Sequence, residues 1–473
     1  MATIRSSLMR LALSASPSLL LTGCPLSDDY FVDYGTSAVG GQKAVGGQKG
    51  VGGVGATGGT TPTGTFAACG TSNCSNTCCN GQCADLTSDP SNCRTCGTVC
   101  AGGRACVSGT CVSGWASMAA PPATFVAREK SAYVAIDDRL FIFGGADTND
   151  DSLSNGAIYD PRTNRWTLIV IDSNAPSPRR LATAVWTGSS VLVFGGRIDT
   201  VSAGYSDAAV YDPAADHWLS EPNNSNGRVG PIGVGSSLFS AFWGGWGANS
   251  AVLSGTERFD WSNTTWTAAT STTYSDPGVL AHTAWAFTGQ YLYLYGGQVN
   301  STTETSAAYS YNLLTNTWRS LASTSSTLAP SARLGALGVW DGNSFYVWAG
   351  RDDSSAKSDG AAWSSGTWKS MTSTGAPTAR WAPSRQTGWA FARGSGDLVF
   401  IGGLDALGNY FNDGARYVEN STTAGAGTWT SIPKWPSGEN HQWGVAAYVG
   451  GALIVWGGHN GTAATATGER WAP

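Results

Sequence analysis

Charges, histidines and long apolar runs are scarce in this chain, and each shortage excludes a class of function. Of 473 residues, 12% are charged, the net charge is −5 and four are histidine: His217, His282, His441 and His459. A nucleic-acid-binding surface needs a basic excess, so we expect no nucleic-acid partner. No Gly-x-Ser-x-Gly elbow, His-Glu-x-x-His or phosphate-binding glycine loop occurs. We therefore expect no catalytic residues, no metal and no cofactor.

The longest apolar run near the N-terminus, Leu11 to Leu21, is too short to span a bilayer. It follows Arg5 and Arg10 and ends in Leu21-Thr22-Gly23-Cys24. This pattern resembles the lipobox of bacterial lipoproteins, which implies that residues 1–23 are removed and that Cys24 carries lipid. An ordinary secretory signal is the alternative. We predict an extracytoplasmic protein of the cell envelope, held at the outer membrane or cell surface.

Residues 24–66 contain little that can form a core. After Cys24, the hexapeptide Ala38–Lys43 is repeated as Ala44–Lys49, and Gly, Thr and Pro follow. Such a composition cannot bury enough apolar surface to fold. We predict a disordered, flexible Gly-rich tether.

Cysteine is absent from residues 113–473 but dense in residues 67–112. An even number in a short exported segment predicts a framework of five disulfides. These cysteines are Cys69, Cys74, Cys78, Cys79, Cys83, Cys93, Cys96, Cys100, Cys106 and Cys111. A zinc or redox site at Cys93–Cys96 is disfavoured because no histidine lies nearby. The runs 78–83 and 89–97 resemble the Stig1-like cysteine-rich module, which implies an extracellular setting and no catalysis.

The rest of the chain is a repeat of about 50 residues. Each copy has an apolar run ending in a glycine pair, then an aromatic residue, and in most copies a Trp a few residues later; one example is Gly195-Gly196, Tyr211 and Trp218. A fifth copy reads Ala349-Gly350. Each unit has about four β-rich runs broken by turn residues. Such marks are the Kelch signature, so residues 113–473 resemble the Kelch β-propeller family.

Seven copies predict an all-β, seven-bladed propeller. The last copy stops at Pro473 without its Trp strand, while an unassigned Trp115 precedes the first glycine pair. We therefore expect the strand around Trp115 to complete the last blade, which would leave no open edge.

Known propeller enzymes fit this sequence poorly. Galactose-oxidase-like copper enzymes need a Tyr–Cys crosslink, and residues 113–473 hold no cysteine. Sialidase Asp-boxes are missing, since the nearest stretch, Ser364–Trp368, lacks the Asp. Acidic loops such as Asp147–Asp151 are interpreted as turns rather than calcium ligands, as are Asn155, Asp207, Asp359 and Asp413 before the aromatic strands.

In six of seven copies, one position holds a basic residue. It lies 16 residues before the first residue of the glycine pair, and in the sixth copy, where a turn is one residue longer, 17 residues before it. The residues are Arg128, Arg179, Arg228, Arg333, Arg385 and His441, with Leu280 in the fourth copy. We favour a structural role, in which each Arg bonds a neighbouring loop. The alternative is a ring at the channel mouth that captures an anionic ligand, because Arg forks suit carboxylates and phosphates.

Two functions remain. The first is a lipid-anchored binding protein that presents the propeller to a protein or polysaccharide. The second is an exported glycan-active enzyme on the same scaffold. The fold hosts both and does not choose between them, but the missing motifs favour binding.

Overall fold

The structure is a computed structural model. It describes residues 67–69, 72–74, 77–100, 104–199, 203–221, 226–247, 251–269, 277–278, 280–299, 303–321, 328–353, 355–384, 386–420 and 426–472. All of them belong to the unit Phe31–Pro473. Cys24 and the predicted tether lie outside the described residues. Among the residues described, there is no helix with the length and apolar character to cross a membrane.

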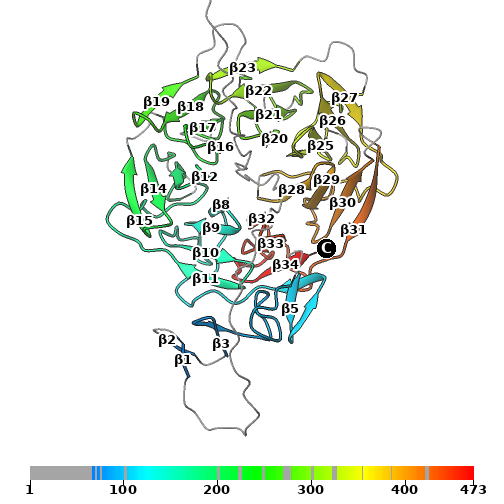
Figure 1. Ribbon diagram of the computed structural model, residues 1–473. Coiled ribbons are helices and arrows are strands. Elements are labelled where there is room, and N and C mark those ends of the chain that lie inside the picture. Colours follow the sequence, from blue (N-terminus) through cyan, green and yellow to red (C-terminus); the bar gives the residue numbers. More distant parts are fainter. Residues whose placement is uncertain are drawn as a thin grey trace, which may run out of the picture. The chain divides into compact units, whose positions relative to one another are not determined.

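Seven four-stranded antiparallel sheets form a closed ring, as predicted, and we number these blades 1 to 7 in chain order (Figure 1). Blades 1 to 3 are β8 (Ala132–Ile136), β9 (Arg139–Phe143), β10 (Gly156–Asp160) and β11 (Arg165–Leu168); β12 (Thr183–Trp186), β13 (Val191–Phe194), β14 (Ala208–Asp212) and β15 (His217–Glu221); and β16 (Ile232–Gly235), β17 (Phe239–Trp243), β18 (Thr256–Asp260) and β19 (Thr265–Ala268). Blades 4 to 6 are β20 (Ala284–Phe287), β21 (Tyr291–Tyr295), β22 (Ala308–Asn312) and β23 (Thr317–Ser320); β24 (Leu337–Trp340), β25 (Phe345–Trp348), β26 (Gly360–Ser364) and β27 (Thr367–Ser370); and β28 (Gly388–Gly394), β29 (Asp397–Gly402), β30 (Gly414–Glu419) and β31 (Gly427–Ile432).

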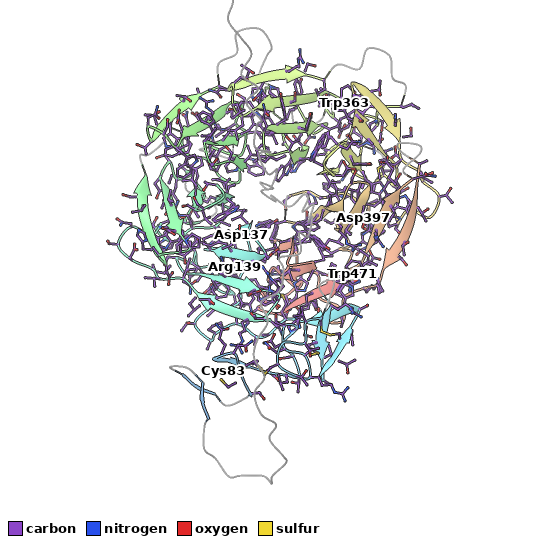
Figure 2. All side chains as sticks on the ribbon, viewed as in Figure 1. Cys83, Asp137, Arg139, Trp363, Asp397 and Trp471 are labelled. Carbon is purple, nitrogen blue, oxygen red and sulfur yellow. A yellow bond between two sulfur atoms is a disulfide. The ribbon has the colours of Figure 1, made fainter. Side chains whose placement is uncertain are left out.

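Blade 7 closes the ring with a strand from the other end of the chain, which confirms the prediction for Trp115. Its strands are β32 (Val445–Val449), β33 (Ala452–Trp456), β34 (Gly468–Ala472) and β7 (Gly114–Ser117). In the register of β34 and β7, Trp471 lies opposite Trp115, and Figure 2 labels Trp471 on β34. The Trp115 indole also donates to the carbonyl of Pro433, 2.7 Å away in the segment after blade 6.

Aromatic residues of the repeat pack within and between blades. Tyr211 and Trp218 lie opposite each other on β14 and β15, with ring centroids 5.2 Å apart. Phe141 of blade 1 packs against Tyr211 of blade 2 at 5.5 Å. The face between blades 1 and 2 is therefore packed with aromatic rings, and Figure 2 shows side chains between the sheets around the ring. Large rings suit this task because each buries a wide area at a low cost in conformational freedom.

The glycine pair is required by the close approach of the next blade. Gly195 and Gly196 both have positive φ angles, 71° and 86°. A Cβ on Gly195 would lie 2.4 Å from the carbonyl oxygen of Arg228. A side chain at this position would push blade 3 away from blade 2.

The cysteine-rich segment consists of three short hairpins stapled by disulfides. Its strands are β1 (Ala67–Cys69), β2 (Ser72–Cys74), β3 (Thr77–Cys79), β4 (Gln82–Ala84), β5 (Ala105–Val107) and β6 (Thr110–Val112). The bridges are Cys79–Cys96, Cys93–Cys106 and Cys100–Cys111, with Cα atoms 5.3 to 5.5 Å apart. Cys78 and Cys83 are also disulfide-bonded, whereas the side chains of Cys69 and Cys74 lie outside the described residues.

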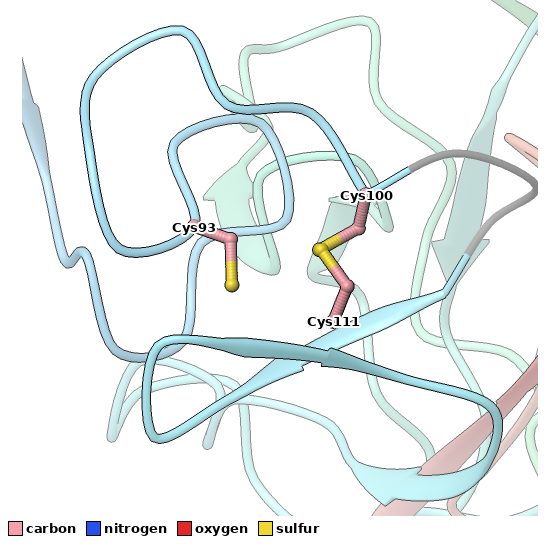
Figure 3. A group of neighbouring side chains, drawn as sticks. All are labelled: Cys93, Cys100 and Cys111. Atoms are coloured by element: carbon pink, nitrogen blue, oxygen red, sulfur yellow. A yellow bond between two sulfur atoms is a disulfide. The ribbon is translucent and has the colours of Figure 1, made fainter.

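One cysteine cluster in this segment has the proximity of a metal site. The sulfur atoms of Cys93, Cys100 and Cys111 lie within 4.8 Å of one another. Figure 3 shows the sulfur–sulfur bond that joins Cys100 to Cys111, and Cys93 is bonded to Cys106. A zinc ligand must be a thiolate, so these disulfides account for the cluster without a metal.

Candidate functional site: the propeller channel and its blade seams

The predicted arginine ring is buried rather than open to a ligand. Arg179 is 1% exposed, and its guanidinium donates to the carbonyl of Gly195 at 2.9 Å and to both carboxylate oxygens of Asp207 at 2.8 and 2.6 Å. Its Nε donates to the carbonyl of Ser177 at 2.9 Å. The fork thus ties the glycine turn to the loop before β14, and acceptors of its own blade occupy its donors.

The same arrangement recurs around the ring. Arg333 bonds the carbonyl of Ala349 and both oxygens of Asp359, and Arg128 bonds the carbonyl of Gly144 and the side chain of Asn155. Arg228 bonds the carbonyl of Gly244 and pairs with Glu257 at 3.4 Å. All of these arginines are buried. The geometry supports the structural role and gives no support to anion capture.

In blade 6 the sequence register needs correction. The structure gives the equivalent contacts to Arg380, which donates to the carbonyl of Gly402 and to Asp413, both at 3.0 Å. Arg380 precedes the first residue of its inner strand, Gly388, by eight positions, whereas Arg333 precedes Leu337 by four. Counting back from the glycines therefore missed the inserted segment. Arg385 itself lies outside the described residues.

The acidic residues before the aromatic strands do more than form turns, which corrects the prediction. Asp207, Asp359 and Asp413 accept from the arginine of their own blade. The signal was available in the sequence, because arginine and Asx occur together in blades 1, 2, 5 and 6; in blade 3, Gly255 stands at the Asx position and Glu257 pairs with the arginine. Blade 4 lacks both the arginine and the acidic residue, because Leu280 and Ala307 stand at these two positions.

Blade 7 replaces the arginine with His441, which is 0% exposed. One ring nitrogen lies 2.7 Å from the carbonyl of Gly457 and the other 2.9 Å from a carboxylate oxygen of Glu469. Burial raises the pKa of Glu469, but the hydrogen bond and charge of His441 outweigh it and leave that pKa lowered. This pair has the role of an arginine fork rather than of a reactive dyad.

Two backbone hydrogen bonds join neighbouring blades on the channel side of most seams. At seam 1/2, the amide of Gly145 donates to the carbonyl of Arg179, and the amide of Leu181 to that of Lys130, both at 2.8 Å. Seams 2/3, 4/5, 5/6 and 7/1 have the same two bonds, at 2.7 to 2.9 Å. Seams 3/4 and 6/7 lack both among the residues that the structure describes.

The two unbonded seams differ in what replaces the missing bonds. Beside seam 6/7, Arg393 donates to the hydroxyl of Tyr448 at 3.2 Å, and Gln386 of blade 6 reaches the carbonyl of Ser131 at 2.7 Å. At seam 3/4 the described hydrogen bonds lie on the outer strands, for example from Trp318 to Thr256 at 2.8 Å. The channel side of seam 3/4 is therefore open.

A cavity of about 200 Å³ occupies the channel and extends into seam 3/4. Residues from the inner strands of all seven blades line it, and so do Trp243, Gly245, Leu280 and His282 from the open seam. Its aromatic lining is Tyr133, Trp243, Trp246, Trp285 and Trp389. No Asp, Glu, Lys or Arg is among the described lining residues. The cavity is an uncharged, aromatic site.

His282 is the histidine of the cavity wall. Burial lowers its pKa, although a backbone hydrogen bond at Pro383 acts in the opposite direction. The ring is therefore neutral at pH 7 and offers a neutral polar group. Sequence reasoning named His282 but missed the tryptophans, whose signal was weak: Trp246 directly follows a glycine pair, where other copies have Ala, Arg, Gln, Leu or His.

Comparisons with known proteins agree with this architecture. The family description Attractin/LZTR1 beta-propeller matches residues 140–361. An F-box/kelch-repeat protein of Arabidopsis thaliana is 27% identical over 134 residues, which is 28% of this chain and 34% of that protein. The N-acetylneuraminate epimerase of Yersinia enterocolitica is 26% identical over 170 residues, which is 27% of this chain and 41% of that protein.

A solved structure, titled "Structure of YjhT", is 17% identical in sequence and superposes with a TM-score of 0.48. The match covers 66% of this chain and 99% of that chain. The chain matches only about a third of the length of the Arabidopsis protein and two fifths of the epimerase. The sheet order shows a seven-bladed β-propeller, and the family model and the Arabidopsis relative support a Kelch-type scaffold.

Proposed function

We propose that the chain is a lipid-anchored binding protein of the bacterial cell envelope, which presents its propeller to a polysaccharide. The lipobox-like Leu21–Cys24 supports the anchor, and the disulfide-rich segment supports an oxidising, extracytoplasmic setting. A protein ligand is the less favoured form of the same proposal.

The observation that carries the choice of ligand is the uncharged aromatic cavity. Binding sites for small ligands are mostly apolar, with a few polar groups that fix orientation. Here Trp246 and Trp285 offer flat apolar faces, and His282 and Thr283 offer neutral hydrogen-bonding groups. A sugar ring has a matching apolar face and a rim of hydroxyls. An anionic ligand would find no counter-charge in the described lining.

The alternative is an exported glycan-active enzyme, and the likeness to an N-acetylneuraminate epimerase favours it. Most glycoside hydrolysis needs two carboxyl groups beside the scissile bond. The described residues of the cavity wall include no carboxylate. This lining disfavours glycoside hydrolysis in the cavity, and we propose binding without turnover as the function of this site.

Two experiments test the proposal. In affinity electrophoresis, neutral polysaccharides should retard the purified protein, and the double variant Trp246→Ala with Trp285→Ala should abolish this retardation. Retardation by polyuronates alone would contradict the proposed ligand class.

In cells, Cys24→Ala should abolish palmitate labelling and release the protein from membranes. An unlabelled wild type that pellets as the variant does would refute the anchor.

A further inference from the structure

The open seam 3/4 concentrates hydrogen-bonding groups that have no partner. The indole Nε1 of Trp243 and the hydroxyl of Thr283 are buried, and neither bonds any described residue. The backbone amides of Gly245 and His282, which in other blades would donate across the seam, have no hydrogen bond within the described part of the chain. All four residues line the cavity.

Comparison with blades 5 and 7 shows that the free indole of Trp243 is a feature of blade 3. Trp348 and Trp456 occupy the position of Trp243 in blades 5 and 7, and their indoles donate to the carbonyls of Ser358 and Ala466, both at 3.0 Å. Each of those tryptophans donates a hydrogen bond within its own blade. The indole of Trp243 donates to no group among the described residues of blade 3.

Blade 4 lacks the arginine fork that, in blades 1, 2, 3, 5 and 6, ties the glycine turn to the following loop of the same blade. Leu280 stands where Arg179 and Arg333 stand in their blades, and it lines the cavity wall. Leu280 has no charged group to offer the loop before β22, where Ala307 replaces the acidic residue. The seam therefore presents an apolar side chain, Leu280, next to hydrogen-bond donors that have no partner among the described residues.

From this juxtaposition we propose that the channel side of seam 3/4 is a subsite for one uncharged sugar ring. The ring packs against Trp246 and Trp285, and its hydroxyl oxygens accept from Trp243 Nε1 and from the amides of Gly245 and His282. The Thr283 hydroxyl bonds a further ring hydroxyl, and the carbonyls of Gly230 and Leu280 accept in return. A hydroxylated ring suits this set because each hydroxyl both donates and accepts.

The size of the cavity sets the length of the occupant. At about 200 Å³ it lies below the range of roughly 300 to 1,000 Å³ typical of drug-sized ligands. One terminal or side-branch residue of a glycan fits, and a continuous polymer does not. This inference rests on the proposed function and adds to it the blade seam, the hydrogen-bonding residues and the size of the recognised unit.

The test uses the full chain and four neutral probes: cellotetraose, xylotetraose, maltotetraose and chitotetraose. Trp243→Phe keeps the ring and deletes the donor, and Trp348→Phe is the matched control in blade 5. By titration calorimetry we expect the wild type to bind at least one probe, Trp243→Phe to bind it roughly 10-fold more weakly, and Trp348→Phe to bind it unchanged. The melting temperature should fall in Trp348→Phe, which orphans a carbonyl, but not in Trp243→Phe.

Thr283→Val provides a second, nearly isosteric variant and should also weaken binding. Wild-type binding that both Trp243→Phe and Thr283→Val retain in full overturns the subsite and leaves the proposed function standing. A wild type that binds none of the four probes overturns both.

Discussion

Seam 1/2 and seam 3/4 are built from the same repeat, yet only the first is fastened. At seam 1/2, Arg179 fixes the loop of blade 2, and two backbone bonds tie blade 2 to blade 1. At seam 3/4, Leu280 replaces the arginine and both bonds are absent among the described residues. The comparison teaches that the channel cavity can extend into a seam that lacks these bonds, while the five bonded seams and the closing strand hold the ring.

The largest expected effect comes from removing the arginine fork of blade 2, beside the bonded seam. Arg179→Met should lower the free energy of unfolding by about 2–3 kcal/mol, since a charged group with several hydrogen bonds is lost. Asp207 is about a third exposed and can regain water, which limits the loss. Leu280→Met is the matched control and should cost less than about 1.5 kcal/mol. Equal losses in urea denaturation would contradict the comparison.

The next effect comes from restoring the arginine fork of blade 4, beside the open seam. The double variant Leu280→Arg with Ala307→Asp restores both halves of the fork found in blades 2 and 5. We expect it to gain about 1 kcal/mol of stability and to lose oligosaccharide binding at least 10-fold, because the new side chain fills the base of the cavity. A variant that gains stability but binds as tightly as the wild type would show that the ligand sits elsewhere.

The architecture itself was predictable from the sequence, for local reasons. The glycine pairs mark the inner turn of each blade, and the missing Trp strand of the last copy points to Trp115. The arginine contacts were less predictable, because Arg179 and Asp207 meet only when the blade folds. Arg380 escaped because an insertion before β28 breaks the count. The open seam depends on two absent bonds, which no residue pattern states, although Leu280 and Ala307 mark the blade.

A smaller effect should appear on acidification. The pKa of His282 is lowered in the folded protein by burial, so the unfolded chain binds a proton first as pH falls. Stability is therefore full above the ordinary histidine pKa of about 6.5 and declines as the pH drops below it toward the folded value. His282→Gln should flatten the pH dependence of the melting temperature between about pH 7 and 5. An unchanged slope would place the titration at another group.

The smallest effect is expected from reducing agents. The described disulfides all lie in the segment before the propeller, and residues 113–473 contain no cysteine. Dithiothreitol should therefore leave the stability difference between Arg179→Met and Leu280→Met unchanged. A difference that vanishes on reduction would mean that the disulfide segment, rather than the forks, distinguishes the seams.

The most direct test of the account is backbone amide hydrogen exchange at the two seams, measured residue by residue by NMR. The amides of Gly145 and Leu181 donate across seam 1/2 and should exchange slowly. The amides of Gly245 and His282 should exchange faster, and the oligosaccharide that binds should slow them selectively. Equal protection at both seams without ligand, or ligand protection that leaves Gly245 and His282 unchanged, would contradict the account.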